Sequence, residues 1–338
     1  MILNENDKQS VKQYNFFVRN NRRGQVSQDT LWGKLKKNWG HLYIYRKNSR
    51  GDIIAAMGIL TIEAVPGKIL AYCPKGPIAD FYNIDLIKSL INEAISNLPK
   101  NTFLIRMDPE VDFDKKLNQN YLKAGFKTRN LQVKKMHGNI QPRLNIVMSY
   151  KGIQDKNQLM RHFKRTYRTE IRHSIRDGVK VKFGTNQKYV NSFYKVYKKM
   201  ADSHHITYRP ISYFYRMSDL FTKTGLFRIY LAYYQENVIA AGIGFSYGDE
   251  IWYMYAGSDR DYSKHLAPYL IQWEMTKWGL AEKKSEYDFG GVGSFDMSDG
   301  LYRFKHGFAY RDKPKTYIGE IDKVLDKKAY KKYLKNFE

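Results

Sequence analysis

The sequence predicts an α/β protein built from two copies of one folding unit, because three features recur along the chain at a nearly constant interval. The matching pairs are residues 52–58 with 237–243, Asp108 with Asp288, and the Lys-x-Gly-Phe sequence at 123–126 with that at 305–308. The members of each pair are separated by about 180 to 185 residues, which is difficult to obtain by chance. An internal duplication therefore organises the chain.

Each copy is expected to run through three strands, a helix, a strand that ends at an aspartate, and a second helix. The apolar segments 53–60 and 238–245 are too short for ordinary helices and are typical of buried strands. Residues 84–98 and 267–280 have the longer apolar spacing of helices. Such alternation indicates a sheet with helices packed on its faces.

The repeat also sets the expected domain boundaries. The first domain is expected to span residues 1–145 together with 318–338, and the second residues 146–317. We interpret the tail from Ile318 as a helix that returns to the first domain. The sequence has no uninterrupted pair of heptad repeats, so no coiled-coil arm is expected.

Composition indicates a globular protein of a reducing compartment. The chain has 338 residues, of which 43% are hydrophobic, and its 28 Tyr and 18 Phe can fill two cores. Cys73 is the only cysteine, which excludes an intrachain disulfide and a cysteine-built metal site. The first residues lack the regions of a secretion signal, and no apolar run reaches the roughly 20 residues that span a bilayer. We therefore expect cytoplasmic residence and no stable membrane insertion.

Positive charge is the second global feature, since 58 Lys and Arg oppose 33 Asp and Glu. The formal net charge of +25 attracts polyanions without specifying which one. Within residues 155–178 an apolar residue recurs every fourth position, which predicts one face of a single helix. A stripe of arginines lies beside that face, at Arg161, Arg165, Arg168, Arg172 and Arg176. Arginine suits a phosphate backbone, so we expect RNA contact here, with a solvated surface as the alternative.

The order of elements in each copy is the one that GNAT-like (acyl-CoA N-acyltransferase-like) domains use, and the whole chain resembles the FemABX family, closest to its FemX type. The segments that carry the resemblance are residues 25–28, Trp32, Lys36, 108–110, 141–145, 206–210, 253–257 and 304–306. The resemblance implies transfer of an amino acid, alanine first and serine next, from aminoacyl-tRNA to the lysine ε-amine of a peptidoglycan stem peptide. UDP-MurNAc-pentapeptide is the implied acceptor, and its lipid-linked form is the alternative. A monomer without a cofactor is expected.

The same resemblance implies roles for individual residues. Lys36, Arg209, Tyr213 and Tyr255 are the implied contacts of the precursor, and Phe304 is an implied contact of the tRNA. Without the resemblance, Lys36 is a surface lysine in a helical run over residues 29–39. Arg209 is then equally well explained by an ion pair, and the two tyrosines by packing.

Lys305 and Asp108 are the expected catalytic residues. An aminoacyl ester is already activated, so the enzyme must supply proximity, a neutral amine and a cation for the developing oxyanion. The resemblance places Lys305 as that cation. Asp108 would orient or deprotonate the amine, although a carboxylate of ordinary pKa is a weak base for an ammonium. Asp288 is expected to be a structural relic of the duplication.

Two other classes of protein stay open. A coenzyme A dependent N-acyltransferase would share the fold, but the sequence lacks the Arg/Gln-x-x-Gly-x-Gly/Ala loop that cradles the pyrophosphate. A non-catalytic RNA-binding protein would explain the charge but not the paired aspartate-ended strands. The adjacent His204 and His205 point apart and have no carboxylate at ligand spacing, so no metal site is expected.

Overall fold

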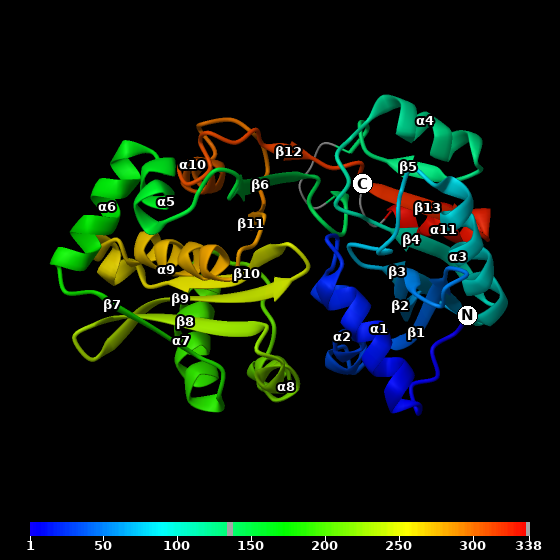
Figure 1. Ribbon diagram of the computed structural model, residues 1–338, viewed down its shortest axis with the longest axis horizontal. Coiled ribbons are helices and arrows are strands. Elements are labelled where there is room, and N and C mark those ends of the chain that lie inside the picture. The colour runs from blue at the N-terminus through cyan, green and yellow to red at the C-terminus, as the bar shows by residue number, and fades with distance from the viewer. Residues whose placement is uncertain (134–137, 336–338) are drawn as a thin grey trace. The chain divides into compact units, whose positions relative to one another are not determined.

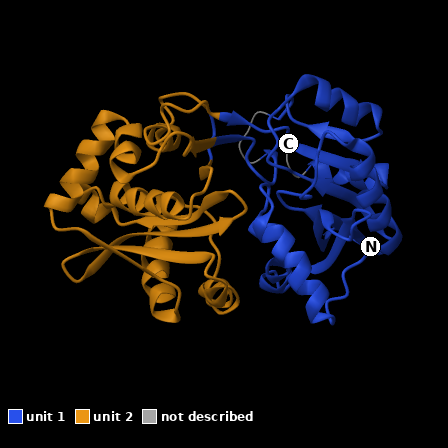
Figure 2. Cartoon of the chain, in the orientation of Figure 1, with its two compact units in different colours: residues 1–145, 291–294, 315–338 blue, residues 146–290, 295–314 orange. Residues whose placement is uncertain are grey.

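The computed structural model describes residues 1–133 and 138–335, and the chain forms two compact units (Figures 1 and 2). Unit 1 contains residues 1–145, 291–294 and 315–338, and unit 2 contains residues 146–290 and 295–314. The units divide after Asn145, where the repeat predicts a boundary. Residues 291–294 and 315–317, which we assigned to the second domain, instead group with unit 1.

Unit 1 is built on a six-stranded sheet of order β1-β2-β3-β4-β13-β5 (Figure 1). Its strands are β1 (Gly40–Lys47), β2 (Ile53–Val65), β3 (Lys68–Cys73), β4 (Thr102–Met107), β5 (Lys127–Arg129) and β13 (Glu320–Val324). β3 and β4 are parallel, and the other neighbours are antiparallel. Because β13 inserts between β4 and β5, the prediction that the tail is helical from Ile318 is wrong at its start. The helix begins only at Lys327.

The described residues of unit 1 also form helices and a 3-10 turn. They are α1 (Lys8–Asn20), η1 (Val26–Gln28), α2 (Thr30–Leu35), α3 (Ile84–Asn97), α4 (Lys115–Lys123) and α11 (Lys327–Leu334). α3 begins where the Asn83 side chain accepts a hydrogen bond from Leu86 N, and its residues at helical spacing are buried. Alternate residues of β3 enter different apolar clusters, Cys73 that of α3 and Tyr72 that of α11. The two helices therefore cover opposite faces of the sheet.

Unit 2 repeats this plan around the strand order β6-β11-β10-β9-β8-β7. The strands are β6 (Leu144–Ser149), β7 (Lys180–Gly184), β8 (Phe227–Tyr234), β9 (Asn237–Tyr247), β10 (Glu250–Ser258) and β11 (Glu286–Gly291). A short strand, β12 (Lys315–Thr316), pairs with the first two residues of β6. β10 and β11 are parallel, as β3 and β4 are in unit 1. The predicted strands at 53–60 and 238–245 are confirmed within β2 and β9.

The helices that the described residues of unit 2 form include the predicted helix at 267–280, which is confirmed as α9, and several that the repeat did not predict. They are α5 (Lys156–His162), α6 (Arg165–Arg176), α7 (Gln187–Ser203), α8 (Ile211–Phe221), η3 (Thr222–Thr224), η4 (Arg260–His265), α9 (Ala267–Ala281) and α10 (Gly300–His306). None of the helices formed by the described residues has the length and apolar character needed to cross a membrane.

The single helix predicted over residues 155–178 is wrong, because the chain breaks into α5 and α6. Phe163 and Lys164 have extended backbone between the two helices. The Phe163 ring is fully buried against Trp273 and Phe308, and Lys164 N donates to the Gly307 carbonyl. Burial of this ring, together with the backbone hydrogen bond, accounts for the interruption.

Candidate functional site

Asp108 lies directly after β4 in unit 1, and only 6% of the residue is exposed. Both of its carboxyl oxygens accept hydrogen bonds, Oδ2 from the Tyr72 hydroxyl at 2.5 Å and Oδ1 from the Lys75 backbone N–H at 2.6 Å. Burial raises the pKa of Asp108 to about 8, although these two hydrogen bonds favour the ionised form. A carboxyl group with such a pKa exchanges its proton near neutral pH.

The turn after β3 is fixed by the segment 25–28, which contributes to the family resemblance. Ser27 Oγ and Gln28 Nε2 each donate to the Pro74 carbonyl at 2.8 Å. A Cβ at Gly76 would lie 2.4 Å from a side-chain carbon of Gln28, so only glycine fits there without movement. This turn presents the Lys75 N–H that binds Asp108.

A partly buried ion pair adjoins the same turn. The Lys75 ammonium donates to Glu110 Oε1, and Gln25 Nε2 donates to Glu110 Oε2 at 2.5 Å. Gln141 Nε2 in turn donates to the Tyr72 hydroxyl oxygen at 3.3 Å. Segments 25–28, 108–110 and 141–145 therefore supply one polar network. Sequence reasoning noted these segments only as resemblance and missed Tyr72 and Lys75, which lie in no such segment.

Lys36 belongs to unit 1 and follows the last residue of α2, so the predicted helical run over residues 29–39 is wrong beyond Leu35. Its backbone N–H donates to the carbonyls of Trp32 and Gly33, and its ammonium lies 5.0 Å from the centre of a Trp32 ring. Lys36 is half-buried. Its role toward phosphate stays a prediction.

In unit 2 the structure brings Arg209, Tyr213 and Tyr255 together. The Arg209 guanidinium carbon lies 5.5 Å from the centre of the Tyr213 ring, as expected for residues four apart at the start of α8. The Tyr255 hydroxyl donates to the Tyr213 hydroxyl at 3.4 Å. Arg209 is exposed while Tyr213 is 4% exposed, so the cluster presents a cation above aromatic rings.

Tyr255 stands on β10 next to a register irregularity. The pairing with β9 shifts between Tyr253 and Tyr255, so the simple alternation that we assumed for these two tyrosines is interrupted. The Tyr255 ring packs edge-on against the rings of Tyr197 and Phe214. Burial raises the pKa of Tyr255, which keeps its hydroxyl protonated as a hydrogen-bond donor.

Lys305 projects from α10 toward the end of β11. It is 8% exposed, and its Nζ lies 3.5 Å from the position that a Cβ would occupy at Gly290. Burial lowers the pKa of Lys305 to about 8, while the charges of Asp288 and Asp299 oppose this shift. Lys305 is therefore mostly a cation at pH 7 and loses its charge as the pH rises above about 8.

Asp288 lies within β11 and is fully buried. Its Oδ1 accepts a hydrogen bond from Gly290 N at 2.7 Å, which supports the glycine-lined turn beside Lys305. Gly290 has a φ of +79°, a conformation that glycine adopts with least strain. The turn at Gly290 therefore lies against the lysine.

Phe304 is half-buried in an aromatic cluster of unit 2. Its ring lies 5.2 Å from that of Tyr269 and 5.5 Å from that of Phe308, with both pairs in edge-on geometry. These contacts explain the residue as packing. Its contact with tRNA stays a prediction.

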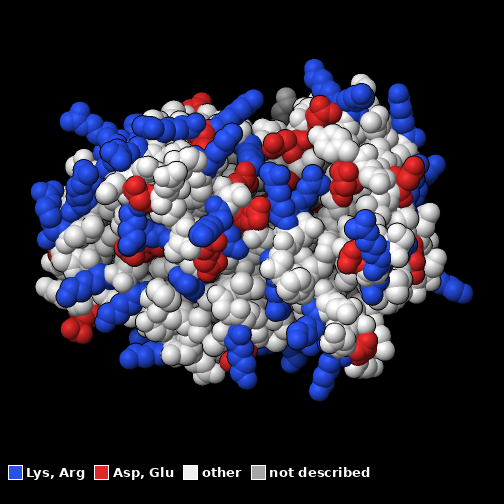
Figure 3. Space-filling view, viewed as in Figure 1, with Lys and Arg blue, Asp and Glu red and all other residues white. Residues whose placement is uncertain are grey.

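The arginines of the predicted stripe lie on α5 and α6, and Figure 3 shows basic side chains gathered over these helices. Arg161, Arg165 and Arg172 are exposed, whereas Arg168 is half-buried and its Nη1 donates to the Arg161 carbonyl at 3.4 Å. A surface hollow of about 450 Å³ is lined by Thr169, Arg172, Ile175 and Arg176. The break between the helices divides the stripe but leaves it exposed.

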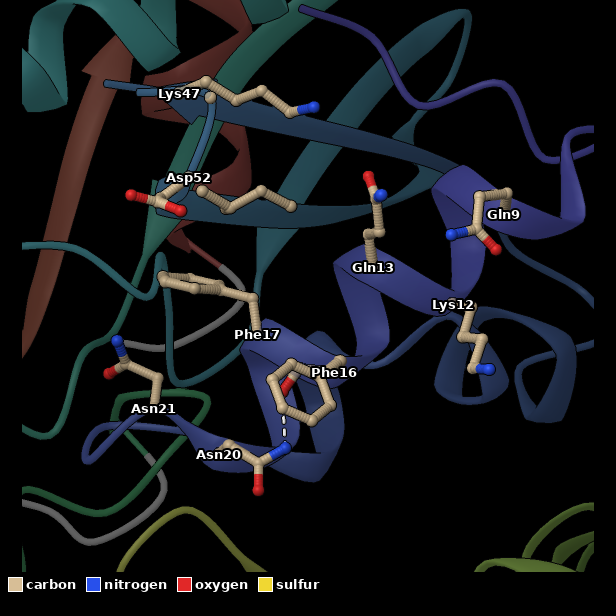
Figure 4. Close-up of a pocket in the computed structure, with 11 residues that line it drawn as sticks. Gln9, Lys12, Gln13, Phe16, Phe17, Asn20, Asn21, Lys47 and Asp52 are labelled. Atoms are coloured by element: carbon tan, nitrogen blue, oxygen red, sulfur yellow. Dashed lines mark hydrogen bonds between the residues drawn. The ribbon is translucent and has the colours of Figure 1, made fainter. Parts of the chain in front are cut away.

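A larger hollow of about 590 Å³ lies between α1 and the turn that joins β1 to β2 (Figure 4). Lys12, Phe16, Phe17, Lys47 and Asp52 are among its lining residues. None of the predicted site residues is among the described residues that line it. This hollow therefore gives no support to the predicted chemistry.

Comparison with known proteins gives consistent matches over nearly the whole chain. The sequence profile of the FemAB family matches residues 9–236 and 228–335. The UDP-N-acetylmuramoylpentapeptide-lysine N(6)-alanyltransferase of Weissella viridescens is 40% identical over 99% of both chains. The lipid II:glycine glycyltransferase of Staphylococcus aureus (strain MRSA252) is 22% identical over 94% of this chain and 92% of its own.

Solved structures agree on the fold. The crystal structure of FemX superimposes with a TM-score of 0.86 at 19% identity, covering 96% of this chain and 98% of that one. A tandem GNAT protein of the clavulanic acid biosynthesis pathway has a TM-score of 0.55 at 10% identity, over 96% of this chain and 97% of its own. The prediction of two tandem GNAT-like domains is thereby confirmed.

Proposed function

Because this chain belongs to the FemAB family, we propose that it transfers an amino acid from aminoacyl-tRNA to the lysine ε-amine of the stem peptide of UDP-MurNAc-pentapeptide. The observation that carries the proposal is the 40% identity, over 99% of both chains, with the Weissella viridescens alanyltransferase. Alanine is accordingly the proposed amino acid, with serine next. The name of the Staphylococcus aureus relative makes a lipid-linked acceptor the alternative.

The proposed reaction exchanges an ester for an amide. The lysine nitrogen attacks the ester carbonyl carbon, the bond from that carbon to the ribose oxygen breaks, and the proton lost by the amine balances the one gained by the ribose oxygen. Because the ester is already activated, the reaction needs no cofactor. Charged tRNA is made in the cytoplasm, so the proposal also places this protein there. The proposed enzyme acts as a monomer.

Lys305 is the proposed cation for this reaction. Its charge would stabilise the carbonyl oxygen of the tetrahedral intermediate and then the departing ribose oxygen. The buried position supports this assignment, since a charge acts more strongly where water is excluded. Asp108 is the proposed partner of the attacking amine.

Binding of the two anionic substrates is assigned to different residues. Lys36, Arg209, Tyr213 and Tyr255 are the proposed contacts of the precursor, since phosphate requires cations and hydroxyl donors. The arginines of α5 and α6 and Phe304 are the proposed contacts of the tRNA. The exposed arginines and the cation above the Tyr213 ring support this division.

Mass spectrometry of the acceptor tests the proposal. The purified protein is incubated with UDP-MurNAc-pentapeptide and with alanyl-tRNA, seryl-tRNA or uncharged tRNA. We expect the acceptor to gain the mass of one alanine residue, more slowly that of serine, and nothing with uncharged tRNA. Acetylation with acetyl-CoA in place of the charged tRNA would instead indicate the N-acyltransferase class. Binding of tRNA without any transfer, to this acceptor or its lipid-linked form, would indicate an RNA-binding protein.

A further inference from the structure

Tyr72 occupies a place set by strand pairing beside Asp108. β3 and β4 are parallel, and Tyr72 lies opposite Arg106, two residues before Asp108. Residues two apart on a strand share a face, so Arg106 and Asp108 both project toward the side on which Tyr72 is buried. The sheet itself therefore brings the Tyr72 hydroxyl to the Asp108 carboxyl group.

The direction of the hydrogen bond between them is also fixed. The Gln141 amide donates to the Tyr72 oxygen at 3.3 Å, so the single hydroxyl proton of Tyr72 is left to point at Asp108 Oδ2, 2.5 Å away. Oδ1 is occupied by the Lys75 N–H. The carboxyl group is thus held at both oxygens, with donors on each.

We propose that Tyr72, oriented by Gln141, is the positioning residue that favours the ionised form of Asp108 and holds its carboxyl group in one orientation for the transfer reaction. The proposal rests on the proposed function for its catalytic consequence. The hydrogen bond by which Tyr72 stabilises the Asp108 carboxylate does not depend on substrate, so its effect can be measured on the protein alone. Tyr72 itself is not assigned a contact with either substrate.

The groups around Asp108 determine whether its pKa is raised or lowered. Arg106 on β4 favours the carboxylate, and Glu320 on β13 disfavours it. The Lys75 ammonium is paired with Glu110, so that pair adds little net charge. Burial is the largest influence and raises the pKa of Asp108 to about 8. Loss of the Tyr72 donor should raise that pKa further, because a hydrogen bond to the carboxylate favours the ionised form.

Tyr72→Phe tests the proposal with Tyr121→Phe as its matched control. Tyr121 is also fully buried in unit 1, but its hydroxyl donates to the Phe81 carbonyl at 2.9 Å. In Tyr72→Phe we expect the pKa of Asp108 to rise by about one unit, the effect of one hydrogen bond to a charged group. At pH 7, kcat should then be about tenfold below that of the native enzyme, and this ratio should shrink as the pH is raised. Tyr121→Phe should match the native enzyme at every pH.

A kcat ratio between Tyr72→Phe and the native enzyme that does not change with pH would overturn the proposal. Equal ratios in Tyr72→Phe and Tyr121→Phe would overturn it as well. Gln141→Met provides a second test, because it removes the group that orients the Tyr72 proton without touching Asp108. We expect a smaller rise in the pKa of Asp108. Thermal unfolding of each variant shows whether it is folded.

A titration without substrate separates this inference from the proposed function. Carboxyl carbon NMR of protein labelled at aspartate, with Asp108→Asn to identify the signal, reports the titration midpoint of Asp108 directly. We expect that midpoint to be about one unit higher in Tyr72→Phe than in the native protein. An unchanged midpoint would refute the role of Tyr72 even in an active enzyme. Absence of transfer by the native protein, with a shifted midpoint, would refute the proposed function alone.

Discussion

The two units place an aspartate in or directly after corresponding strands and surround it differently. Asp108 follows β4 and accepts from Tyr72 and from the Lys75 N–H, whereas Asp288 lies in β11 and accepts from Gly290 N. Two residues beyond each aspartate, unit 1 has Glu110 and unit 2 has Gly290. The carboxylate at 110 pairs with a lysine of the neighbouring turn, while the glycine at 290 lies beside a lysine from a helix.

The two lysines of the repeated Lys-x-Gly-Phe sequence also differ in their burial. Lys123 ends α4 and is exposed, whereas Lys305 is 8% exposed and lies beside Gly290. The two repeated scaffolds thus differ in the residues around each aspartate. In this account unit 1 holds a carboxyl group fixed by donors and unit 2 holds a buried cation.

Replacing the repeat lysine should change kcat strongly in unit 2 and hardly at all in unit 1, the largest difference that we expect between the two units. Lys305→Met keeps the aliphatic stem but removes the charge, and we expect kcat to fall on the order of 10²-fold or more, with the KM of the acceptor nearly unchanged. Lys123→Met, at the equivalent exposed position, should leave both constants as they are. Steady-state kinetics with each substrate varied separately makes the test. An increased KM for aminoacyl-tRNA at normal kcat would instead assign Lys305 to tRNA phosphate.

Arg209 tests whether unit 2 also binds the precursor. Arg209→Ala removes the guanidinium above the Tyr213 ring, and the acceptor KM should rise about tenfold, the effect of one charged contact of roughly 1.5 to 3 kcal/mol. Arg260→Ala, an exposed arginine that contacts His204, is the control and should leave KM unchanged. Equal KM values in both variants and the native enzyme would make Arg209 a packing residue.

Gly290 tests whether the backbone beside Lys305 must keep its conformation. Gly290→Ala introduces strain at a φ of +79° in the turn that lies against Lys305 Nζ, so we expect reduced stability and a several-fold fall in kcat. Gly225→Ala shares the strain, at a φ of +73°, but its Cβ would meet no atom within 4 Å. Thermal unfolding should show similar losses for both. A similar fall in kcat for Gly225→Ala would show that the effect is one of stability only.

The smallest expected effect concerns tRNA. Arg165→Ala combined with Arg168→Ala should reduce the slope of log K against log salt by roughly 0.7 to 0.9 for each phosphate interaction that the substitutions remove. The control is Lys115→Ala with Lys116→Ala, which removes equal charge from exposed positions on α4 of unit 1. Fluorescence binding of labelled tRNA at several salt concentrations measures the slope. Equal slopes in the two double variants would assign the stripe to solvent.

Sequence reasoning recovered the repeated order of elements because the apolar periods of strands and helices are local properties. It failed at residues 318–324, where the charged side chains concealed a strand. Asp322 and Glu320 point inward to the buried Arg106 on β4, while Ile321 enters the other core. A sequence pattern that assigns charged residues to the surface cannot predict charged side chains that are buried in ion pairs against a sheet.

The sequence predicted the candidate site only in part, because contacts between residues distant in sequence are not visible in local patterns. Lys305 and Asp108 came from the family resemblance, and their burial and contacts came only from the structure. Tyr72 was missed because an apolar strand such as β3 predicts packing for a tyrosine, and its partner Asp108 is distant in sequence. Pairing across parallel strands, which no local pattern reveals, created the contact.

The pH dependence of kcat above neutrality tests the central claim most directly, namely that unit 2 supplies a buried lysine as the catalytic cation. Because burial lowers the pKa of Lys305 to about 8, the charge is present below that pH and lost above it, so kcat of the native enzyme should fall above about pH 8. Arginine stays charged throughout this range, so Lys305→Arg, although slower, should show no such fall. The same alkaline fall in Lys305→Arg as in the native enzyme would contradict the account.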